Sequence, residues 1–445
     1  MESNKKNVNE KEIPSTPHPE YGFDTLQVRA GLRADSTTGA YAMPVYQTVG
    51  YEFESVDDAV EQFELKKPGS IYSRIANPTV AALELRIAAL EKGAGTVCFA
   101  SGMAAIVAAI QNIAETGSEI ISMSQLYGGT HTLLFDRFRH RYGISVKRVD
   151  IDDFAALSET ISPLTRCVFI ETLGNPLLTV PDFEKIASIA HRAGIPVIAD
   201  NTFGTPYLFD AKAHGIDFTV HSLTKYIGGH GNSVGGSVTD LGSFSFKNKP
   251  RFEEFNRPDP CYHGLIYADL GDKGYLAKLR AGFLRDTGAC LAPWNAFLFL
   301  LGIDTLSLRL EKHTRNAQQI AEWLENQPET AWIRYPGLPS DPCFERAQKY
   351  FPRGSGGIFT FGIKGGLTAG KKFIDALNLF SLVANVADVR SMVVHPASTT
   401  HSQLSEEDMK STGILPEMIR VSVGIEDVDD LIADFKQALA ASQRR

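Results

Sequence analysis

Residues 218–236 read FTVHSLTKYIGGHGNSVGG and hold one lysine at the end of a short apolar run. Lys225 follows the apolar residues Phe218, Val220 and Leu223, so folding would remove much of its water. Loss of water lowers the pKa of an amine, and a neutral amine is a nucleophile that condenses with aldehydes. The stretch therefore predicts a lysine placed for covalent chemistry with an aldehyde.

Two hydroxyl side chains, Ser222 and Thr224, precede the lysine, and glycines follow it. Hydroxyls and the backbone N–H groups of such a turn donate hydrogen bonds to an anion. An aldehyde that carries a phosphate satisfies both features, and pyridoxal 5'-phosphate (PLP) is such a molecule. Taken alone, a lysine beside glycines is equally well explained as a solvated residue of an ordinary loop, so other residues must decide.

The composition is that of a globular protein with a full core, because 43% of the 445 residues are hydrophobic. A formal net charge of -8 argues against a nucleic-acid partner, whose binding surface needs concentrated basic residues. Residues 1–17 are polar and are expected to be disordered. The chain has neither a signal-peptide pattern nor an apolar run of about 20 residues, so we expect a cytoplasmic protein without a membrane partner.

Cysteines occur at positions 98, 167, 261, 290 and 343. None of the spacings between them is typical of a zinc site, so we expect reduced thiols and no metal.

The chain from residue 71 to 292 alternates short strands with helices. Strands are expected at residues 96–100, 119–122, 145–149, 167–171 and 196–199, and helices at 80–91, 104–114, 130–142, 155–161 and 183–193. Such alternation indicates a mostly parallel sheet with helices on both faces, and ligands bind such sheets at the carboxyl ends of the strands. We therefore expect an α/β protein whose large domain covers residues 71–292.

Three other segments break this alternation. Residues 18–70 are rich in Tyr, Phe and Pro without a sustained period, which favours an extended arm that packs on another surface, often that of a partner subunit. Residues 247–286 are too long for an ordinary loop and are expected to form an ordered insertion or entrance wall. Residues 293–445 are expected to begin with one long, bent helix and to continue as a smaller α+β domain.

Polar side chains stand where the expected strands end. Asp200 ends the buried run IPVIAD, where a carboxylate needs a cation such as a protonated ring nitrogen. Asn175 follows another strand and could bond a ring hydroxyl, while Tyr127 precedes two glycines and could lie flat on an aromatic ring. A turn cap, a residue before proline and a packed aromatic are the structural alternatives for these three residues.

Two further sites suit anions. Gly102 and Met103 lie where a short strand turns into a helix, and a helix N-terminus offers free N–H groups to a phosphate. A plain strand-to-helix connection is the alternative. Arg420 lies within the β-branched run MIRVSV and, if it faces inward, could grip a carboxylate with two hydrogen bonds. An arginine that faces solvent from its strand is the alternative there.

From about His18 to Ala441 the chain resembles the Cys/Met-metabolism family of PLP-dependent enzymes. The motifs that carry the likeness are Tyr72-Ser73-Arg74, Ser101-Gly102-Met103, Asn175-Pro176, Asp200-Asn201-Thr202, HSLTKY at 221–226, HPAS at 395–398 and Arg420. The resemblance implies the fold of type I PLP-dependent transferases, which is similar to that of aspartate aminotransferase.

The resemblance also implies a role for each site residue. Lys225 would form the Schiff base with PLP, Asp200 would pair with the pyridinium nitrogen, Tyr127 would stack on the ring and Asn175 would contact its 3'-hydroxyl. Lys225, Tyr127 and Asp200 would be the catalytic residues. The residues implied to hold the cofactor's phosphate are Gly102, Met103, Ser222 and Thr224, together with Tyr72 and Arg74 from a neighbouring subunit.

Substrate binding is implied at the other end of the chain. Arg420, with Asn385, would bind the α-carboxylate of an amino acid. Members of the family with lyase activity usually have Ser-Leu-Gly where this chain has Asn385-Val386-Ala387, so the carboxylate contact departs from their pattern. Residues shared between subunits imply a homo-oligomer, a dimer at least and commonly a tetramer.

Within the family, one branch replaces the γ-substituent of O-acetylhomoserine. The stretches similar to that branch are ETLGNP (171–176), NTFGTPY (201–207), IGGHGNSVGG (227–236), CYHGLIYADLG (261–271), ANVADVRS (384–391) and HPASTTH (395–401). The resemblance implies that the ester reacts with sulfide or methanethiol to give homocysteine or methionine, and acetate. A γ-lyase or a cystathionine γ-synthase with the same site, and a catalytically silent protein of this fold, stay open as alternatives, as does the preferred ester or thiol.

Overall fold

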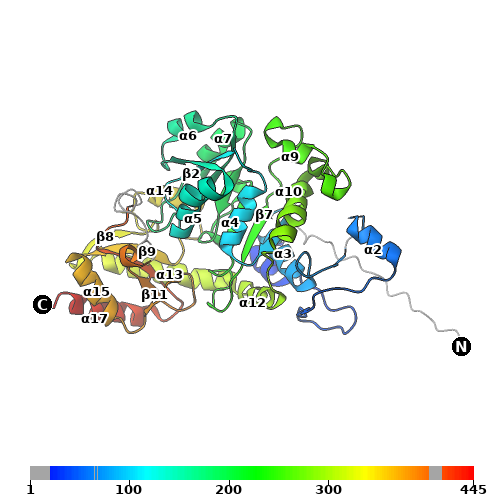
Figure 1. Cartoon of the computed structure of the whole chain (residues 1–445). Helices are drawn as coiled ribbons and strands as arrows, with labels where there is room; N and C mark the ends of the chain where they lie inside the picture. The colour runs from blue at the N-terminus through cyan, green and yellow to red at the C-terminus, as the bar shows by residue number, and fades with distance from the viewer. Residues whose placement is uncertain (1–20, 65, 68, 400–412, 445) are drawn as a thin grey trace.

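The structure, a computed structural model, describes residues 21–64, 66–67, 69–399 and 413–444. The expected disorder of residues 1–17 lies outside these ranges. Two sheets organise the described residues, and two consecutive helices run between them (Figure 1).

The larger sheet orders its strands β1-β7-β6-β5-β4-β2-β3. Their bounds are β1 (Gly95–Phe99), β2 (Glu119–Met123), β3 (Ser145–Val149), β4 (Thr165–Glu171), β5 (Val197–Asp200), β6 (Phe218–Ser222) and β7 (Gly236–Asp240). β7 runs antiparallel to both of its neighbours, and the other pairs are parallel. The central strands β4, β5 and β6 are almost fully buried, as strands covered on both faces must be. The expected α/β architecture is confirmed.

Helices cover this sheet much as the sequence predicts: α3 (Pro78–Leu90), α4 (Gly102–Gln111), α6 (Phe154–Thr160) and α7 (Phe183–Arg192). The helix expected over 130–142 is instead a short helix, α5 (Gly128–Thr132), that continues as a π-helix, η1 (Leu133–Tyr142). Short elements α8 (Thr205–Leu208) and η2 (Lys212–His214) connect β5 to β6. β7 was not predicted from the sequence.

The arm is not wholly extended. It contains α1 (Phe23–Arg29) and α2 (Val56–Phe63), which the sequence analysis missed because neither helix spans more than about two turns. The side chain of Gln27 in α1 exchanges hydrogen bonds with Ser307, whereas α2 reaches away from the rest of the chain (Figure 1). The arm is therefore hydrogen-bonded to the rest of the chain at α1 and extends away from it at α2.

The insertion at 247–286 is ordered, as predicted, and it is built from short helical pieces. These are η3 (Pro250–Phe252), α9 (Glu253–Asn256), η4 (Pro260–Tyr262), η5 (Tyr267–Lys273), α10 (Gly274–Lys278) and η6 (Leu279–Leu284), followed by α11 (Arg285–Thr287). Tyr275 of α10 is buried and donates a hydrogen bond of 3.0 Å to the Ala109 carbonyl in α4. The insertion thus packs on the helix that follows β1.

The single long helix expected after residue 293 is wrong, because the structure has two helices, α12 (Pro293–Ile303) and α13 (Leu306–Glu325). The carboxylate of Asp304 pairs with Arg86 of α3, which holds the chain at the break. Arg309 of α13 donates a hydrogen bond of 2.7 Å to the Gly302 carbonyl. This carbonyl, near the end of α12, is therefore hydrogen-bonded despite the break.

The smaller sheet orders its strands β10-β11-β12-β9-β8 and is mostly antiparallel. Its strands are β8 (Thr330–Arg334), β9 (Ile358–Ile363), β10 (Ser381–Leu382), β11 (Met392–Val394) and β12 (Met418–Ser422), with helices α14 (Phe344–Tyr350), α15 (Gly366–Ala376), η7 (Pro396–Ser398) and α17 (Val428–Ser442). Phe373 of α15 and Phe435 of α17 meet edge to face with ring centroids 5.2 Å apart, which pairs the two helices (Figure 1). This is the smaller α+β unit expected from the sequence.

Among the described residues, every helix is too short or too polar to cross a lipid bilayer.

Candidate active site

Three neighbouring strands of the larger sheet end in polar residues. Glu171, Asp200 and Ser222 are the last residues of β4, β5 and β6, which lie side by side. Glu171 is the register partner of Asp200, so their carboxylates lie on adjacent strands. This edge is where a parallel sheet binds ligands, and it is where the sequence placed the site.

Lys225 lies in the turn after β6, and its amine donates a hydrogen bond of 2.5 Å to the side-chain oxygen of Asn385. Burial, with the positive charge of Arg420 as a smaller cause, lowers the pKa of Lys225 to about 8. At neutral pH a usable fraction of this amine is therefore uncharged. The structure brings the two residues together although 160 positions separate them in the chain.

Contacts from α13 hold the turn that carries Lys225. Arg309 donates hydrogen bonds of 2.7 Å to the Tyr226 carbonyl and 3.3 Å to the Ile227 carbonyl. The hydroxyl of Tyr226 accepts a hydrogen bond of 2.9 Å from the backbone N–H of Gly357. Both contacts join the lysine turn to residues of the C-terminal third, so its backbone has little freedom.

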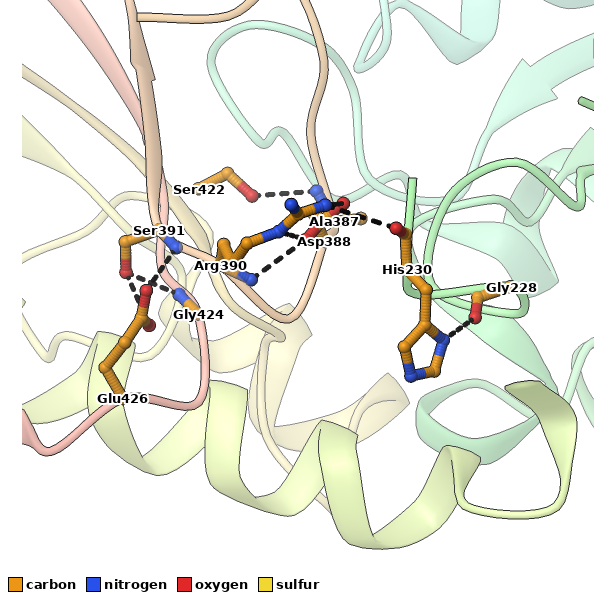
Figure 2. A network of polar contacts seen from close by, with 9 residues as sticks. All are labelled: Gly228, His230, Ala387, Asp388, Arg390, Ser391, Ser422, Gly424 and Glu426. Carbon is orange, nitrogen blue, oxygen red and sulfur yellow. Dashed lines mark hydrogen bonds and ion pairs between the residues drawn. The ribbon is translucent and has the colours of Figure 1, made fainter. Parts of the chain in front are cut away.

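A second network joins the lysine turn to the loop that carries Asn385, and Figure 2 shows it. Arg390 pairs with Asp388 at 2.9 Å and donates a hydrogen bond of 3.2 Å to the His230 carbonyl. The N–H of Val389 donates to the Gly229 carbonyl at 2.8 Å. Because both loops are tied together, the distance between Lys225 and Asn385 is set by backbone contacts as well as by their own hydrogen bond.

The same loop is anchored to β12. Ala387 has a left-handed backbone (φ 61°), and its N–H donates a hydrogen bond of 2.7 Å to Ser422 Oγ (Figure 2). A non-glycine residue in this conformation is held there by its surroundings. Glu426 accepts from the backbone N–H of Ser391 at 2.6 Å and fixes the far end of the loop.

Asp200 is hydrogen-bonded by Thr202 and forms no ion pair with any of the described residues. The Thr202 N–H donates to Asp200 Oδ1 at 3.0 Å, and Thr202 Oγ1 accepts from the Ser222 N–H at 2.8 Å. Burial raises the pKa of Asp200, although the Thr202 contacts oppose the rise. A cation placed beside this carboxylate would lower its pKa and favour the charged form.

Arg420 lies in the middle of β12 with only 4% of its surface exposed. It donates one hydrogen bond of 3.3 Å from Nη1 to Asn175 Oδ1, and its Nε has no partner among the described residues. Burial lowers the pKa of Arg420 to about 10, so the guanidinium is still charged at neutral pH. A buried, charged and incompletely bonded guanidinium is suited to accept a carboxylate.

The N-terminus of α4 approaches the end of β6 closely. A Cβ added to Gly102 would lie 2.7 Å from Ser222 Cβ, so only glycine fits there. Ser101 caps the helix by accepting from the Ala104 N–H at 3.1 Å. The first N–H groups of α4 have no partner within the helix, and they stand beside a serine hydroxyl.

Two other residues expected near a phosphate have protein contacts. Thr224 Oγ1 accepts from the Gly235 N–H at 3.1 Å and contacts the Gly235 carbonyl at 3.4 Å. Met103, the second residue of α4, places its sulfur 4.0 Å from the Thr130 hydroxyl. The position of Thr224 thus supports the glycine turn, whether or not its hydroxyl also reaches a ligand.

Tyr127 is 45% exposed and precedes α5. Its N–H donates a hydrogen bond of 2.7 Å to Glu171 Oε1. A Cβ on Gly129 would lie 2.6 Å from the Tyr127 ring, so the ring rests against a bare stretch of backbone. An aromatic face is therefore available near the ends of β4 and β5.

Within the part of the chain that the structure describes, Tyr72 and Arg74 make no side-chain hydrogen bond to the other site residues. Arg74 bonds the carbonyl of Arg285, and its guanidinium lies 5.3 Å from the centre of the Tyr72 ring. Tyr72 is 42% exposed. Both side chains therefore face the insertion and solvent.

Sequence reasoning missed three residues that organise this site, namely Glu171, Thr202 and Arg309. Glu171 and Thr202 flank predicted strand ends, so the same argument that selected Asp200 could have found them. Arg309 gives no such signal, because it lies in a long helix and only the tertiary contact reveals its role.

The residues present fit PLP. Its aldehyde, its ring nitrogen and its phosphate call for an amine, an anion and a set of N–H donors. The chain offers the amine of Lys225, the buried carboxylate of Asp200 and the N-terminus of α4 beside Ser222, a cradle that a Cβ on Gly102 would fill.

Comparison with known proteins agrees with this fit. Residues 24–440 match the family model described as Cys/Met metabolism PLP-dependent enzyme. The chain is 46% identical to the protein named homocysteine synthase of Schizosaccharomyces pombe over 94% of this chain and 98% of the other. It is 43% identical to the O-acetyl-L-homoserine sulfhydrylase of Leptospira meyeri, over 94% and 96% of the two chains.

A solved structure extends the agreement to three dimensions. It is described as a candidate O-acetylhomoserine (thiol)-lyase of Campylobacter jejuni with an N'-pyridoxyl-lysine-5'-monophosphate residue. The two chains are 40% identical, with a TM-score of 0.92 over 94% of this chain and all of the other. The chain described here belongs to the Cys/Met metabolism family of PLP-dependent enzymes.

Proposed function

We propose that the protein converts O-acetylhomoserine and sulfide to homocysteine and acetate. The observation that carries the proposal is the approach of the Lys225 amine to the loop of Asn385, close to the charge of a buried arginine. An amine that can move a proton then stands beside groups that can hold an amino acid. Relatives named homocysteine synthase and O-acetyl-L-homoserine sulfhydrylase support the choice of substrate.

Eight residues of one chain are proposed to hold PLP. Lys225 binds its aldehyde carbon, and Asp200 holds the proton on its ring nitrogen. Tyr127 covers the ring, and Asn175 contacts its 3'-hydroxyl. The residues proposed for the phosphate are Gly102 and Met103, through their backbone N–H groups, and the hydroxyls of Ser222 and Thr224.

PLP held by these residues would supply a sink for the electrons left at Cα of the amino acid when its proton departs. Lys225 takes that proton, because its lowered pKa leaves part of the amine uncharged at neutral pH. The same amine then moves the proton from Cβ, which allows the acetate group to leave Cγ. Asn385 holds the amine in place through these transfers by accepting its hydrogen bond.

Arg420 is proposed to bind the α-carboxylate of the substrate. Its unpaired Nε and its charge, both buried, favour a carboxylate over a neutral group. The bond from Nη1 to Asn175 fixes the orientation of the guanidinium. The NH2 group of Asn385 supplies a further donor, since its oxygen is engaged by Lys225.

Tyr72 and Arg74 are proposed to reach the phosphate of a neighbouring subunit. Arg74 bonds the carbonyl of Arg285 rather than another site residue, and α2 of the arm extends away from the rest of the chain in Figure 1; both support an exchange between copies. The same proposal includes a homodimer with shared sites and the pairing of two dimers into a tetramer. It also includes the cytoplasmic location expected from the sequence.

The test is product analysis with purified enzyme, PLP and homoserine esters. We expect equimolar homocysteine and acetate from O-acetylhomoserine and sulfide, with slower reaction of the succinyl and phosphoryl esters. Formation of keto acid and ammonia at the same rate with and without sulfide would instead identify a γ-lyase. Formation of cystathionine from cysteine in preference to homocysteine from sulfide would identify a cystathionine γ-synthase. Absence of a visible absorbance band after PLP is added would indicate a catalytically silent protein.

A further inference from the structure

Glu171 is a buried carboxylate that the proposed reaction does not use. It ends β4, is 7% exposed and accepts a hydrogen bond of 2.7 Å from the Tyr127 N–H. The backbone N–H of Asn175 favours the charged form of the same carboxylate and so opposes the effect of burial on the pKa of Glu171. The carboxylate of Glu171 thus interacts with backbone N–H groups of two loops, one after β2 and one after β4, and these two strands are adjacent in the sheet.

The two loops carry the side chains proposed to contact the cofactor ring. Tyr127 ends the loop between β2 and α5, and Asn175 lies in the loop after β4. Asn175 also orients Arg420 through the hydrogen bond from Nη1. A shift of either backbone would therefore move a ring contact, and a shift of Asn175 would also move the carboxylate site.

A carboxylate suits this position better than an amide does. A carboxylate accepts hydrogen bonds on both of its oxygens, whereas a glutamine side chain has one acceptor oxygen and an NH2 group that is itself a donor. Burial and the negative charge of Asp200 on the next strand raise the pKa of Glu171, and the two backbone donors oppose that rise. Burying a carboxylate at this position would therefore cost free energy if it made no hydrogen bonds.

We propose that Glu171 is a positioning residue for PLP, which aligns Tyr127 and Asn175 by holding the backbone N–H group of each. The proposal rests on the cofactor placement given under the proposed function. It does not depend on which amino acid or thiol the enzyme uses.

Asp434 provides a matched control. It is a buried carboxylate of α17, and it accepts hydrogen bonds from the backbone N–H groups of Asn378, at 3.0 Å, and Leu379, at 2.8 Å. Figure 1 shows α17 at the end of the molecule away from the larger sheet, whose strand β6 leads to Lys225. Asp434→Asn therefore removes the same kind of bond without touching the loops of the site.

The experiment compares Glu171→Gln with Asp434→Asn in the PLP-loaded enzyme. In Glu171→Gln we expect amide hydrogen exchange at Tyr127 and Asn175 to become at least tenfold faster. We also expect the dissociation constant for PLP to rise roughly 10- to 100-fold, because a buried donor is left unpaired. The visible circular dichroism of bound PLP should weaken for the same reason. In Asp434→Asn all three quantities should match those of the unaltered enzyme, even if the melting temperature falls.

Two outcomes would overturn the proposal. One is equal PLP affinity and equal exchange at Tyr127 and Asn175 in the two variants, which would make Glu171 a structural residue only. The other is faster exchange at these amides with unchanged PLP affinity and circular dichroism, which would separate the loops from the cofactor.

A second variant covers poor folding of Glu171→Gln. Glu171→Asp keeps both oxygens and the charge but shortens the side chain by one carbon, so it should show smaller changes in the same direction. Unchanged exchange and PLP affinity in this variant would also overturn the proposal. All readings are made without amino acid, so failure to turn over O-acetylhomoserine would refute the proposed function and leave this inference standing.

Discussion

The amine of Lys225 lies 2.5 Å from the side-chain oxygen of Asn385, and this hydrogen bond joins the two sheets of the protein. Lys225 follows β6 of the larger sheet, and Asn385 lies between β10 and β11 of the smaller one. The reactive amine is therefore positioned by both halves of the chain. Changes on either side should alter its reactivity.

Lys225→Ala should abolish covalent attachment of PLP while leaving the fold intact, because Lys225 is the lysine that follows the strand ends among the described residues. The measurement is borohydride treatment of the PLP-loaded protein followed by peptide mass analysis. Lys249→Ala is the control, since burial lowers the pKa of Lys249 as well. A pyridoxyl group that is lost in the control and kept in the Lys225 variant would contradict the assignment.

Capture of PLP by the apoenzyme should accelerate as the pH rises through about 8, where half of the Lys225 amine is uncharged. Below that pH the amine is protonated and cannot attack the aldehyde. An ordinary lysine, with a pKa of 10.5, would give a midpoint more than two pH units higher. Stopped-flow absorbance between pH 6 and 11 measures the profile, and a midpoint near 10.5 would show that the amine is not desolvated.

Asn385→Asp should move that midpoint upward, because a carboxylate beside an amine stabilises its charged form. The same change should raise the KM for the amino acid, since a negative charge repels the α-carboxylate. Asn385→Ala separates the two effects, as it removes the hydrogen bond without adding charge. Equal pH midpoints in all three proteins would mean that Asn385 does not act on Lys225.

Arg420→Ala should weaken amino-acid binding by roughly 2 to 5 kcal/mol, the range for removing one side of a buried charged pair. Steady-state kinetics should show it mainly as a higher KM. Arg334→Ala is the control, because Arg334 pairs with the buried Asp341 in the smaller sheet and lies outside the proposed site. An unchanged KM in the Arg420 variant would assign the carboxylate to another group.

His313 should make the protein less stable in acid. Its ring is fully buried, its Nδ1 lies 2.7 Å from the Val423 carbonyl, and burial lowers its pKa to about 4 from an ordinary 6.5. Its Nε2 has no partner among the described residues, so a proton there would be an unpaired buried donor. Above pH 6.5 the ring is neutral in both states and its contribution is complete.

As the pH falls from 6.5 to 4, the unfolded state gains a proton that the folded state resists, so the free energy of unfolding should decrease by about 3 kcal/mol. Urea unfolding at several pH values measures the slope. His313→Gln, which cannot titrate, should flatten it over this range. An identical slope in the two proteins would show that other groups cause the acid sensitivity.

Local features of the sequence determined the order of strands and helices in the larger unit and the residues at the strand ends. The reason is that burial on both faces demands short apolar runs, and a polar residue that ends such a run must face the sheet's ligand-binding edge. Asp200, Ser222 and Lys225 could be selected in this way. The family motifs added the roles of these residues, which periodicity alone does not contain.

Contacts between distant segments decided the rest. The break between α12 and α13 depends on Asp304 meeting Arg86, and the position of Asn385 depends on backbone bonds from Val389 to Gly229. Glu171 accepts a hydrogen bond from the backbone N–H of Tyr127 in another loop, and no pattern of side chains in the sequence predicts such a contact. Residue spacing encodes which face a side chain takes within its own element, whereas the neighbours that set its charge and direction come from tertiary packing.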